Sequence, residues 1–378
     1  MKLVLFGPAY PFRGGIAQFS GVLYQALITA GHDVRVVNFR KQFPRLLFPG
    51  ATQYDDSPQA LKLPSERTFT LWNPFSWMGT ARAIRKQDPD LIAFMWWMPF
   101  FGIGYWAVAK LLPKKYRARI VYVMHNVIPH ERRFGDVYLS RLALNSAHFY
   151  LTLSKTEETQ MRRLFPRVDS TRIRYSPHPV YDCYAPFSGD RAAAQRQIGI
   201  EAEHLLLFFG FVREYKGLDI LLRAMPDILR NDPQLKLVVA GEYYQDRAKY
   251  DAQIASLGIG QSVIIRDHYI SGDEVGAYFA AADCVVLPYR SATQSGIVQV
   301  AYALDTPVIT TDVGGLAEVV EDGVTGFLVP PEDPQAIAEA VRKFYRTGSR
   351  LAFVANVRAA SRRFSWDALI ETITSFAG

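Results

Sequence analysis

The amino-acid sequence predicts an α/β protein with two domains, each built on a parallel sheet with helices on both faces. Short apolar stretches alternate with amphipathic stretches along nearly the whole chain, which is typical of buried parallel strands joined by crossover helices. The alternation occurs in two series, separated near residues 176–190 by a segment rich in proline and turn formers. With 378 residues, 49% of them hydrophobic, the chain can bury a core in each domain.

The first series predicts five strands, and a crossover helix over residues 16–32 follows the first of them. The second series predicts six strands, with helices between them and a last helix over 364–376. The expected strands are 2–7, 33–39, 89–97, 119–126 and 148–154, then 204–210, 235–241, 262–270, 283–289, 306–312 and 326–330. The expected helices of the second series are 218–229, 273–282, 296–304, 314–320 and 333–345. Two Rossmann-like domains follow from this order, with a ligand expected in a central cleft that the carboxyl ends of both sheets face.

One uncharged stretch, Leu91 to Ala109, is nominally long enough to span a bilayer. Pro99, Gly102 and Gly104 interrupt it, so we expect a buried strand, a loop and a helix instead. Its aromatic residues and the basic segment KLLPKKYRAR form the mixture found at membrane interfaces. Peripheral attachment to a membrane therefore stays open.

Charge divides the chain. Residues 1–180 hold 25 Lys/Arg and 11 Asp/Glu, and the remaining residues hold 18 and 25. A basic first half suits nucleic acid, an anionic membrane or a phosphorylated substrate. No zinc-finger, RNA-recognition or basic-helix pattern supports nucleic acid, so we expect none as a partner. Two cysteines and no signal peptide favour the cytoplasm, possibly at the inner face of the cell membrane.

The stretch YRSATQSGIVQVAYALDTPVI, residues 289–309, predicts a helix start. Ser291, Thr293 and Ser295 are N-cap types, and Gly296 lets a ligand approach the backbone. The first amides of a helix lack internal partners and carry part of the macrodipole. This stretch is therefore a candidate anion site.

Two further candidates follow strands of the first series. Gly14 and Gly15 stand before the first helix with Arg13 beside them, but Gly7 is too distant from them for a dinucleotide fingerprint. His125 follows the fourth strand, at the productive edge of such a sheet. Structural roles for the glycine pair and the histidine are the alternatives.

Arg213 and Lys216 come directly after the strand that opens the second series. A guanidinium that clamps and an ammonium that neutralises suit a diphosphate leaving as an anion. The sequence DPD at 88–90 has the form of an acidic metal dyad, but it precedes its strand, and no histidine pair has helical metal spacing. We expect no obligatory metal and no cofactor.

These residues together resemble the retaining glycosyltransferases of the GT-B fold, specifically glycosyltransferase family 4. The likeness rests on the Gly14-Gly15 loop, MHN at His125, YKG at Lys216, the VVAGE strand, and the tail TDVGGLAEVVEDGVTGFLVPPEDPQAIAEAV. It implies an acceptor-binding domain over 1–182, a nucleotide-sugar-binding domain over 183–360, and a helix in 361–378 that returns to the first domain.

The resemblance also implies roles for individual residues. His125, Arg213 and Lys216 would act in catalysis, the histidine near the reacting sugar carbon and the two cations on the diphosphate. The residues implied in donor binding are Gly14, Gly15, Asn126, Gly210, Tyr269, Ile270, Thr293, Gln294, Ser295, Gly296, Ile297 and Gln299, and those in acceptor binding are Arg13, Trp96 and Trp97.

Two departures from the family pattern stand in this sequence. Phe211 occupies the position of a usual arginine, which Arg213 would replace. Ala292 and Val300 occupy the positions of two usual glutamates, so neutral amides and hydroxyls would recognise the sugar instead.

The implied activity is metal-independent transfer of a hexosyl unit from a nucleotide-diphosphate sugar to a sugar hydroxyl, with retention. The basic, aromatic first half favours a lipid-linked acceptor, and envelope polysaccharide synthesis as the setting. The lost glutamates leave two alternatives: a binding or scaffold protein without catalysis, and a nucleotide-sugar epimerase.

Overall fold

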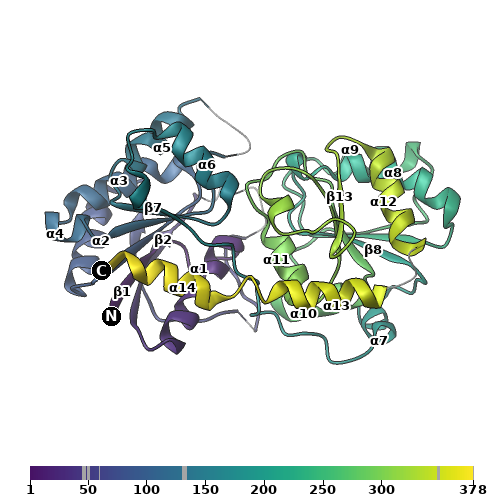
Figure 1. Ribbon diagram of the computed structural model, residues 1–378, viewed down its shortest axis with the longest axis horizontal. Helices are drawn as coiled ribbons and strands as arrows, with labels where there is room; N and C mark the ends of the chain where they lie inside the picture. The colour runs from purple at the N-terminus through teal and green to yellow at the C-terminus, as the bar shows by residue number, and fades with distance from the viewer. Residues whose placement is uncertain (45–47, 49–51, 59, 130–133, 347–349, 378) are drawn as a thin grey trace. The chain divides into compact units, whose positions relative to one another are not determined.

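The computed structural model describes residues 1–44, 48, 52–58, 60–129, 134–346 and 350–377. Contacts divide the chain into two compact units (Figure 1). The first unit holds Met1–Asp56, Ala60–Pro179 and Ser365–Gly378, and the second holds Ser57–Gln59 and Val180–Phe364. The division therefore falls between 179 and 180 and between 364 and 365, whereas the sequence placed it between 182 and 183 and between 360 and 361.

The first unit is built on a seven-stranded parallel sheet in the order β3-β2-β1-β4-β5-β6-β7. Every residue of β4 and β5 is buried, because helices cover both faces of these central strands. The strands are β1 (Lys2–Phe6), β2 (Asp33–Lys41), β3 (Ser65–Thr70), β4 (Leu91–Trp96), β5 (Ile120–Met124), β6 (Phe149–Thr152) and β7 (Ile173–Tyr175).

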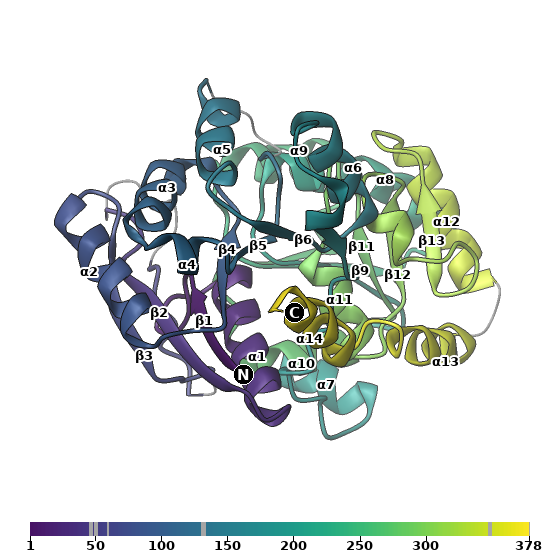
Figure 2. The same ribbon diagram turned by 60° about the vertical axis from the view of Figure 1, so that its left-hand side comes forward.

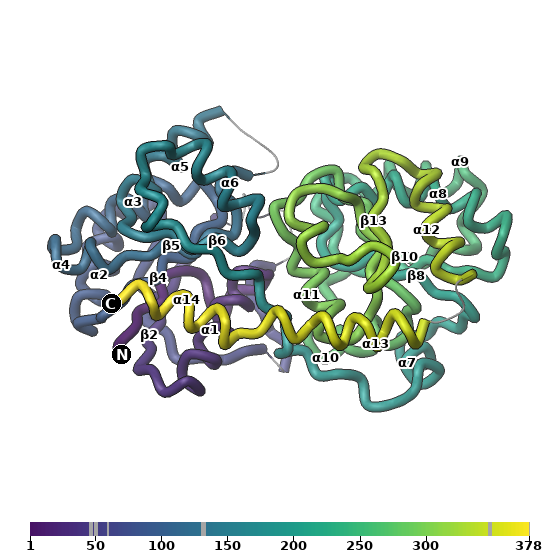
Figure 3. Tube along the Cα trace, in the orientation of Figure 1, coloured from purple at the N-terminus to yellow at the C-terminus, as the bar shows by residue number. Residues whose placement is uncertain are grey.

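The helices of the first unit form two layers. Helices α2, α3 and α5 lie side by side, with α3 between the other two, and α14 lies beside α1 (Figures 1 and 2). In the tube of Figure 3, α1 is purple and α14 is yellow, so these two neighbouring helices come from opposite ends of the chain. The helices are α1 (Gly15–Thr29), α2 (Pro74–Lys86), α3 (Gly102–Leu111), α4 (Lys114–Arg117), α5 (Asp136–Leu144), α6 (Lys155–Leu164) and α14 (Trp366–Thr374).

The second unit is built on a six-stranded parallel sheet in the order β10-β9-β8-β11-β12-β13. Its strands are β8 (Leu205–Phe209), β9 (Lys236–Ala240), β10 (Val263–Arg266), β11 (Cys284–Leu287), β12 (Val308–Thr311) and β13 (Gly326–Val329). Its helices are α7 (Arg191–Gln197), α8 (Leu218–Asn231), α9 (Ala248–Ser256), α10 (Gly272–Ala281), α11 (Gly296–Ala303), α12 (Pro334–Arg346) and α13 (Arg350–Ser361).

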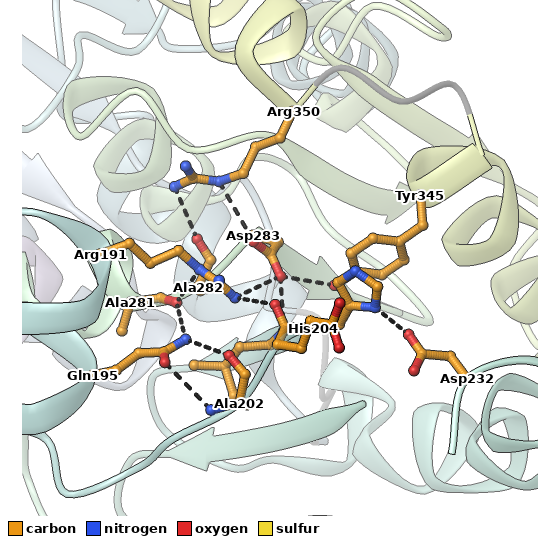
Figure 4. A network of polar contacts seen from close by, with 12 residues as sticks. Arg191, Gln195, Ala202, His204, Asp232, Ala281, Ala282, Asp283, Tyr345 and Arg350 are labelled. Carbon is orange, nitrogen blue, oxygen red and sulfur yellow. Dashed lines mark hydrogen bonds and ion pairs between the residues drawn. The ribbon is translucent and has the colours of Figure 1, made fainter. Parts of the chain in front are cut away.

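A buried carboxylate joins several elements of the second unit (Figure 4). Asp283, just before β11, is 4% exposed. Its Oδ2 accepts hydrogen bonds from the Leu205 amide at 2.8 Å, from Arg191 at 2.9 Å and from the Tyr345 hydroxyl at 3.0 Å. The Arg350 Nε lies 3.6 Å from Oδ1. One side chain thus connects β8, α7, α12 and α13.

The uncharged stretch of the first unit forms a strand and a helix, as the sequence predicts. Residues 91–109 are β4, a short 3₁₀ turn (Pro99–Phe101) and most of α3. In the part of the chain that the structure describes, no helix combines the length and apolar character needed to cross a membrane.

The sequence-based expectations of secondary structure were incomplete, and one was wrong. Strands β3 and β7 were not predicted, and neither were the helices α2, α4, α5, α6, α7, α9 and α13. The helix expected over 314–320 is only a 3₁₀ turn, Leu316–Glu318, because two glycines precede it and one of them has a left-handed backbone, φ +56°.

Candidate functional site

The site of the second unit begins in the turn that follows β8. Lys216 ends a short 3₁₀ turn (Glu214–Lys216), and its side chain is buried, 7% exposed. A methyl group placed on Gly210 would lie 3.1 Å from Lys216 Nζ and 3.2 Å from Ile297 Cδ1. Three residues predicted separately from the sequence are therefore neighbours, and the lysine amine lies beside the start of α11.

Glycine is required directly after this lysine. Gly217 has φ +69°, and a methyl group on it would lie 2.0 Å from the carbonyl oxygen of Pro288. A side chain would suffer both a strained backbone and a collision with another backbone. The close approach fixes Lys216 against the end of β11.

Arg290 anchors the same turn, although no sequence motif predicts this role. Its amide donates to the Tyr215 carbonyl at 2.7 Å, and its Nη1 donates to the Glu214 carbonyl at 2.7 Å. The guanidinium also binds both carboxylate oxygens of Asp219, at 2.8 and 2.7 Å. This bidentate pair holds the turn in one geometry.

The electrostatics of Lys216 are unusual for a lysine. Burial, and then the neighbouring charge of Arg213, lower the pKa of Lys216 to about 7. The Arg213 guanidinium lies 5.0 Å from the centre of the Tyr244 ring, which is stacked on Phe211 at 4.5 Å. Phe211, at the position of the usual family arginine, thus belongs to an aromatic pair that supports Arg213.

Helix α11 begins at Gly296, within the stretch 289–309 in which the sequence predicts a helix start. Ser295 caps it, because its hydroxyl accepts from the Val298 amide at 3.4 Å. The amides of Gly296 and Ile297 precede the first bond inside the helix, so they can donate to an anion. A methyl group on Gly296 would lie 3.3 Å from the ring of Tyr181, which leaves little room for a side chain.

The glycine turn of the 312–320 segment supports this helix start. A methyl group on Gly314, whose φ is +56°, would lie 1.6 Å from the Ala292 carbonyl oxygen. The Gly315 amide donates to the Thr293 carbonyl at 3.0 Å. Two segments that are 22 residues apart in the sequence are therefore joined by backbone contact.

Two glutamine side chains at the same helix have buried carbonyl oxygens without hydrogen-bond partners in the part of the chain that the structure describes. Gln299 is 2% exposed and Gln294 is half-buried. The side-chain carbonyl oxygen of each is buried and has no hydrogen-bond partner among the described residues. Burying an amide oxygen unpaired is costly, so such atoms indicate a ligand that completes them. Ala292 and Val300, where the family has glutamates, are buried, 7% and 4% exposed.

Tyr269 and Ile270 follow β10, which is separated from β8 by β9. Ile270 is buried and Tyr269 is half-buried. They lie at the same carboxyl edge of the sheet as Gly210, two strands away from it. Their predicted role in donor binding stays a prediction.

In the first unit, His125 follows β5 and is 4% exposed. Its ring packs edge-on against Phe19 of α1 at 4.6 Å, and Phe19 also contacts Trp366 of α14 at 5.2 Å. Burial, and then His178, lower the pKa of His125 to about 3, so it is neutral at pH 7. Its Nε2 is buried without a partner among the described residues, which indicates a missing hydrogen bond.

The glycine pair lies one helical turn before Phe19. Gly14 is the residue before α1 and has φ +105°, a conformation that suits glycine. Methyl groups on Gly14 and Gly15 would meet no described atom within 4 Å. A methyl group at either position would therefore collide with no described atom. Arg13 lies in the same loop, its guanidinium 5.7 Å from the centre of the Phe48 ring.

The residues predicted to bind the acceptor do not share one environment. Trp96 is 1% exposed and packs against Tyr105 and Tyr122 in the core. Trp97 is half-buried and packs against Phe101. Asn126, after His125, is also half-buried. We keep Trp97, rather than Trp96, in the proposed acceptor region.

Within the described ranges, no group of three or more His, Cys, Asp or Glu residues could hold a metal ion. Independence from metals stays a prediction.

Comparisons with known proteins identify the family of the chain. The family described as Glycosyltransferase Family 4 matches residues 13–182, and that described as Glycosyl transferases group 1 matches residues 203–347. The D-inositol 3-phosphate glycosyltransferase of Acidothermus cellulolyticus is 27% identical over 392 residues, which cover 95% of this chain and 84% of that protein.

Solved structures show the same fold. Sucrose-phosphate synthase of Thermosynechococcus elongatus aligns with a TM-score of 0.76 at 19% identity, covering 99% of this chain and 98% of that one. The Anabaena protein HepE, in complex with UDP and glucose, aligns with a TM-score of 0.75 at 20% identity, covering 99% of each chain. The chain therefore belongs to glycosyltransferase family 4, among the group 1 glycosyltransferases, and is a glycosyltransferase with the GT-B fold.

Proposed function

We propose that this glycosyltransferase moves a hexosyl unit, with retention, from a nucleotide-diphosphate sugar to a hydroxyl of a sugar acceptor. The observation that carries the proposal is the buried amine of Lys216 beside Gly210 and the first residues of α11. A buried ammonium and unpaired helix amides are suited to a diphosphate. HepE, of similar fold, was solved with UDP and glucose, which makes a UDP-hexose the first donor to test.

The reaction follows from these groups. The bond from the sugar carbon to the diphosphate breaks, and Lys216, Arg213 and the α11 amides stabilise the charge that develops on the leaving oxygen. The acceptor hydroxyl attacks on the face from which the diphosphate leaves, and a diphosphate oxygen takes the hydroxyl proton. The side chains therefore need to supply no strong nucleophile.

Neutral groups would recognise the donor hydroxyls. The unpaired oxygens of Gln294 and Gln299 can accept hydrogen bonds from hydroxyl groups. The unpaired Nε2 of His125 can form one hydrogen bond with a hydroxyl group of a sugar. We further propose a lipid-linked acceptor from envelope polysaccharide synthesis, contacted by Arg13 and Trp97 in the basic first unit.

The absence of both family glutamates favours a second candidate, a protein of this fold that binds a nucleotide sugar without transferring it. One experiment separates the two. Purified protein is incubated with UDP-, GDP- and ADP-hexoses, and the products are resolved chromatographically. Free nucleotide diphosphate and free sugar support the transferase, because water replaces the acceptor. Donor binding without products supports the second candidate, an epimerised sugar supports an epimerase, and no binding of any donor contradicts all three.

Replacing Gly296 by phenylalanine should weaken UDP binding by about tenfold or more, the effect of losing a charge-assisted hydrogen bond. A side chain there would point at the Tyr181 ring and displace the α11 amides. Titration calorimetry with UDP measures the change. Gly260→Phe is the matched control, because a methyl at Gly260 has its nearest described neighbour at 4.0 Å. Equal affinity in both variants would remove the α11 amides from the proposed site.

A further inference from the structure

Exposed apolar side chains are concentrated in one part of the first unit. Twelve large hydrophobic residues are exposed in the described chain, and eight of them lie between residues 72 and 138. Scattered single residues of this kind are normal on a surface, but a concentration marks an interaction surface. The most prominent are Trp72, Phe75, Met78, Ile103, Phe134 and Tyr138, with Phe75 at 81% and Tyr138 at 71% exposure.

These residues lie at the same end of three adjacent helices. Each of α2, α3 and α5 connects two strands of the parallel sheet, so all three run antiparallel to the strands. Seven of the eight exposed residues lie at or near the beginnings of these helices, and Leu111 is the exception. Their apolar ends therefore lie towards the carboxyl edge of the sheet, and His125 directly follows β5 at that same edge.

The helix beginnings are held against the core. The Trp72 ring packs edge-on against Phe100 at 5.3 Å. Gly102 opens α3, and a methyl group on it would lie 2.6 Å from the carbonyl oxygen of Leu139 in α5. A fixed aromatic surface loses little conformational freedom when it binds.

Positive charge lies along the same part of the chain, mostly towards the carboxyl ends of α2 and α3 and after α3, and so away from the apolar ends. Residues 72–87 and 99–119 contain eight Lys/Arg and no Asp/Glu, whereas α5 begins at Asp136. In α2, Arg82 follows Phe75 by seven residues on the same face, and in α5, Arg141 follows Tyr138 by three. Lysine and arginine at helix ends also complement the helix dipole, so the cations alone decide nothing. Cations combined with exposed aromatic residues match an anionic bilayer, which takes rings into its interface and cations onto its phosphates.

We infer that the α2–α3–α5 surface, defined by the six exposed residues named above and the cations of these helices, docks the protein on an anionic membrane. The inference extends the proposed lipid-linked acceptor, because docking brings the edge with His125 towards the lipid. The sequence suggested a membrane contact by the aromatic residues of the stretch 91–109. Trp96 of that stretch is in the core, so we place the membrane contact on the exposed residues of the three helices instead.

The test is flotation of the full-length protein with vesicles of phosphatidylcholine alone or mixed with phosphatidylglycerol. Wild type should float only with the mixed vesicles, and rising NaCl should release it. The variant Phe75→Ser/Tyr138→Ser should bind about tenfold more weakly or worse. The triple variant Arg82→Gln/Arg85→Gln/Lys86→Gln should bind on the order of a hundredfold more weakly.

Matched controls come from the second unit. Leu351→Ser removes a residue that is 76% exposed, and Arg230→Gln/Lys249→Gln/Arg342→Gln removes the same charge. Both should float like wild type, and circular dichroism should show every variant folded. The inference would be overturned if the wild-type protein did not float with the mixed vesicles, or if the surface variants floated as well as wild type. So would a wild-type dimer that the Phe75→Ser/Tyr138→Ser variant converts to a monomer, because a second copy would then cover the surface.

Binding of UDP, measured without vesicles, keeps this result separate from the proposed function. The surface variants should bind UDP as wild type does, since none of their residues belongs to the donor site. Wild type that floats but does not bind UDP would support the docking surface and contradict the proposed donor.

Discussion

Lys216→Ala should lower the turnover number by about 10² or more, the scale of losing one group that stabilises developing negative charge. The amine is buried, lies beside Gly210 and Ile297, and is held by the Gly217 turn. Initial rates of donor hydrolysis or transfer at saturating donor measure the effect. Lys249→Ala, an exposed lysine of the same unit, is the control and should retain the wild-type rate. A near-normal rate for Lys216→Ala would refute the role.

Lys216 should also make the affinity for UDP depend on pH. Since the pKa of Lys216 is lowered to about 7, the free protein loses this charge as pH rises through 7. A bound diphosphate favours the charged form, so UDP binding takes up a proton and weakens above pH 7, by up to about tenfold per pH unit. Calorimetry at about pH 6 and about pH 8.5, in buffers of different ionisation enthalpy, measures both effects.

The control is Lys216→Met, because the terminal phosphate of UDP itself titrates near pH 6. The variant should retain only the pH dependence of the phosphate. An identical pH dependence in wild type and variant would mean that the lysine does not meet the diphosphate.

Asp283→Ala should lower the free energy of unfolding of the second unit by about 3–5 kcal/mol. The substitution leaves Arg191, the Tyr345 hydroxyl and the Leu205 amide without their shared buried acceptor (Figure 4). Glu339→Gln, which breaks an exposed pair with Arg342, should cost no more than about 1 kcal/mol.

Urea unfolding can assign this loss to one unit. All six tryptophans, at positions 72, 77, 96, 97, 106 and 366, belong to the first unit, so their fluorescence reports on it alone. Circular dichroism reports on both units. The Asp283→Ala variant should show an earlier transition by circular dichroism, with a smaller change in fluorescence. Coincident, unshifted transitions would contradict the proposed importance of the carboxylate.

Sequence reasoning succeeded where a strand is a run of apolar residues. All six strands of the second unit were predicted for this reason, including β10 and β13 at the edges of the sheet. The two missed strands of the first unit, β3 and β7, are the edges of their sheet. The sequence SERTFT of β3 is polar and half-exposed, and β7 has three residues, so neither carries an apolar pattern.

The candidate site was predictable to the extent that position along a strand determines it. Lys216, Gly210 and Ile297 could be assigned because each follows or begins an element at the carboxyl edge of the sheet. Arg290 could not, since its partner Asp219 is 71 residues away and only folding brings them together. Trp96 was misleading for a related reason: a strand buried on both faces gives no sign of which aromatic residue reaches the surface.

The packing of α14 against α1 sets an order on biosynthesis. Trp366 contacts Phe19, which in turn contacts His125, and every other segment of the first unit precedes residue 180. During translation the first unit therefore lacks α14 while the ribosome makes the 185 residues from Val180 to Phe364. Phe19 is incompletely covered during this time. A fragment ending at residue 179 should accordingly need chaperones, or residues 365–377 supplied in trans, to stay dispersed.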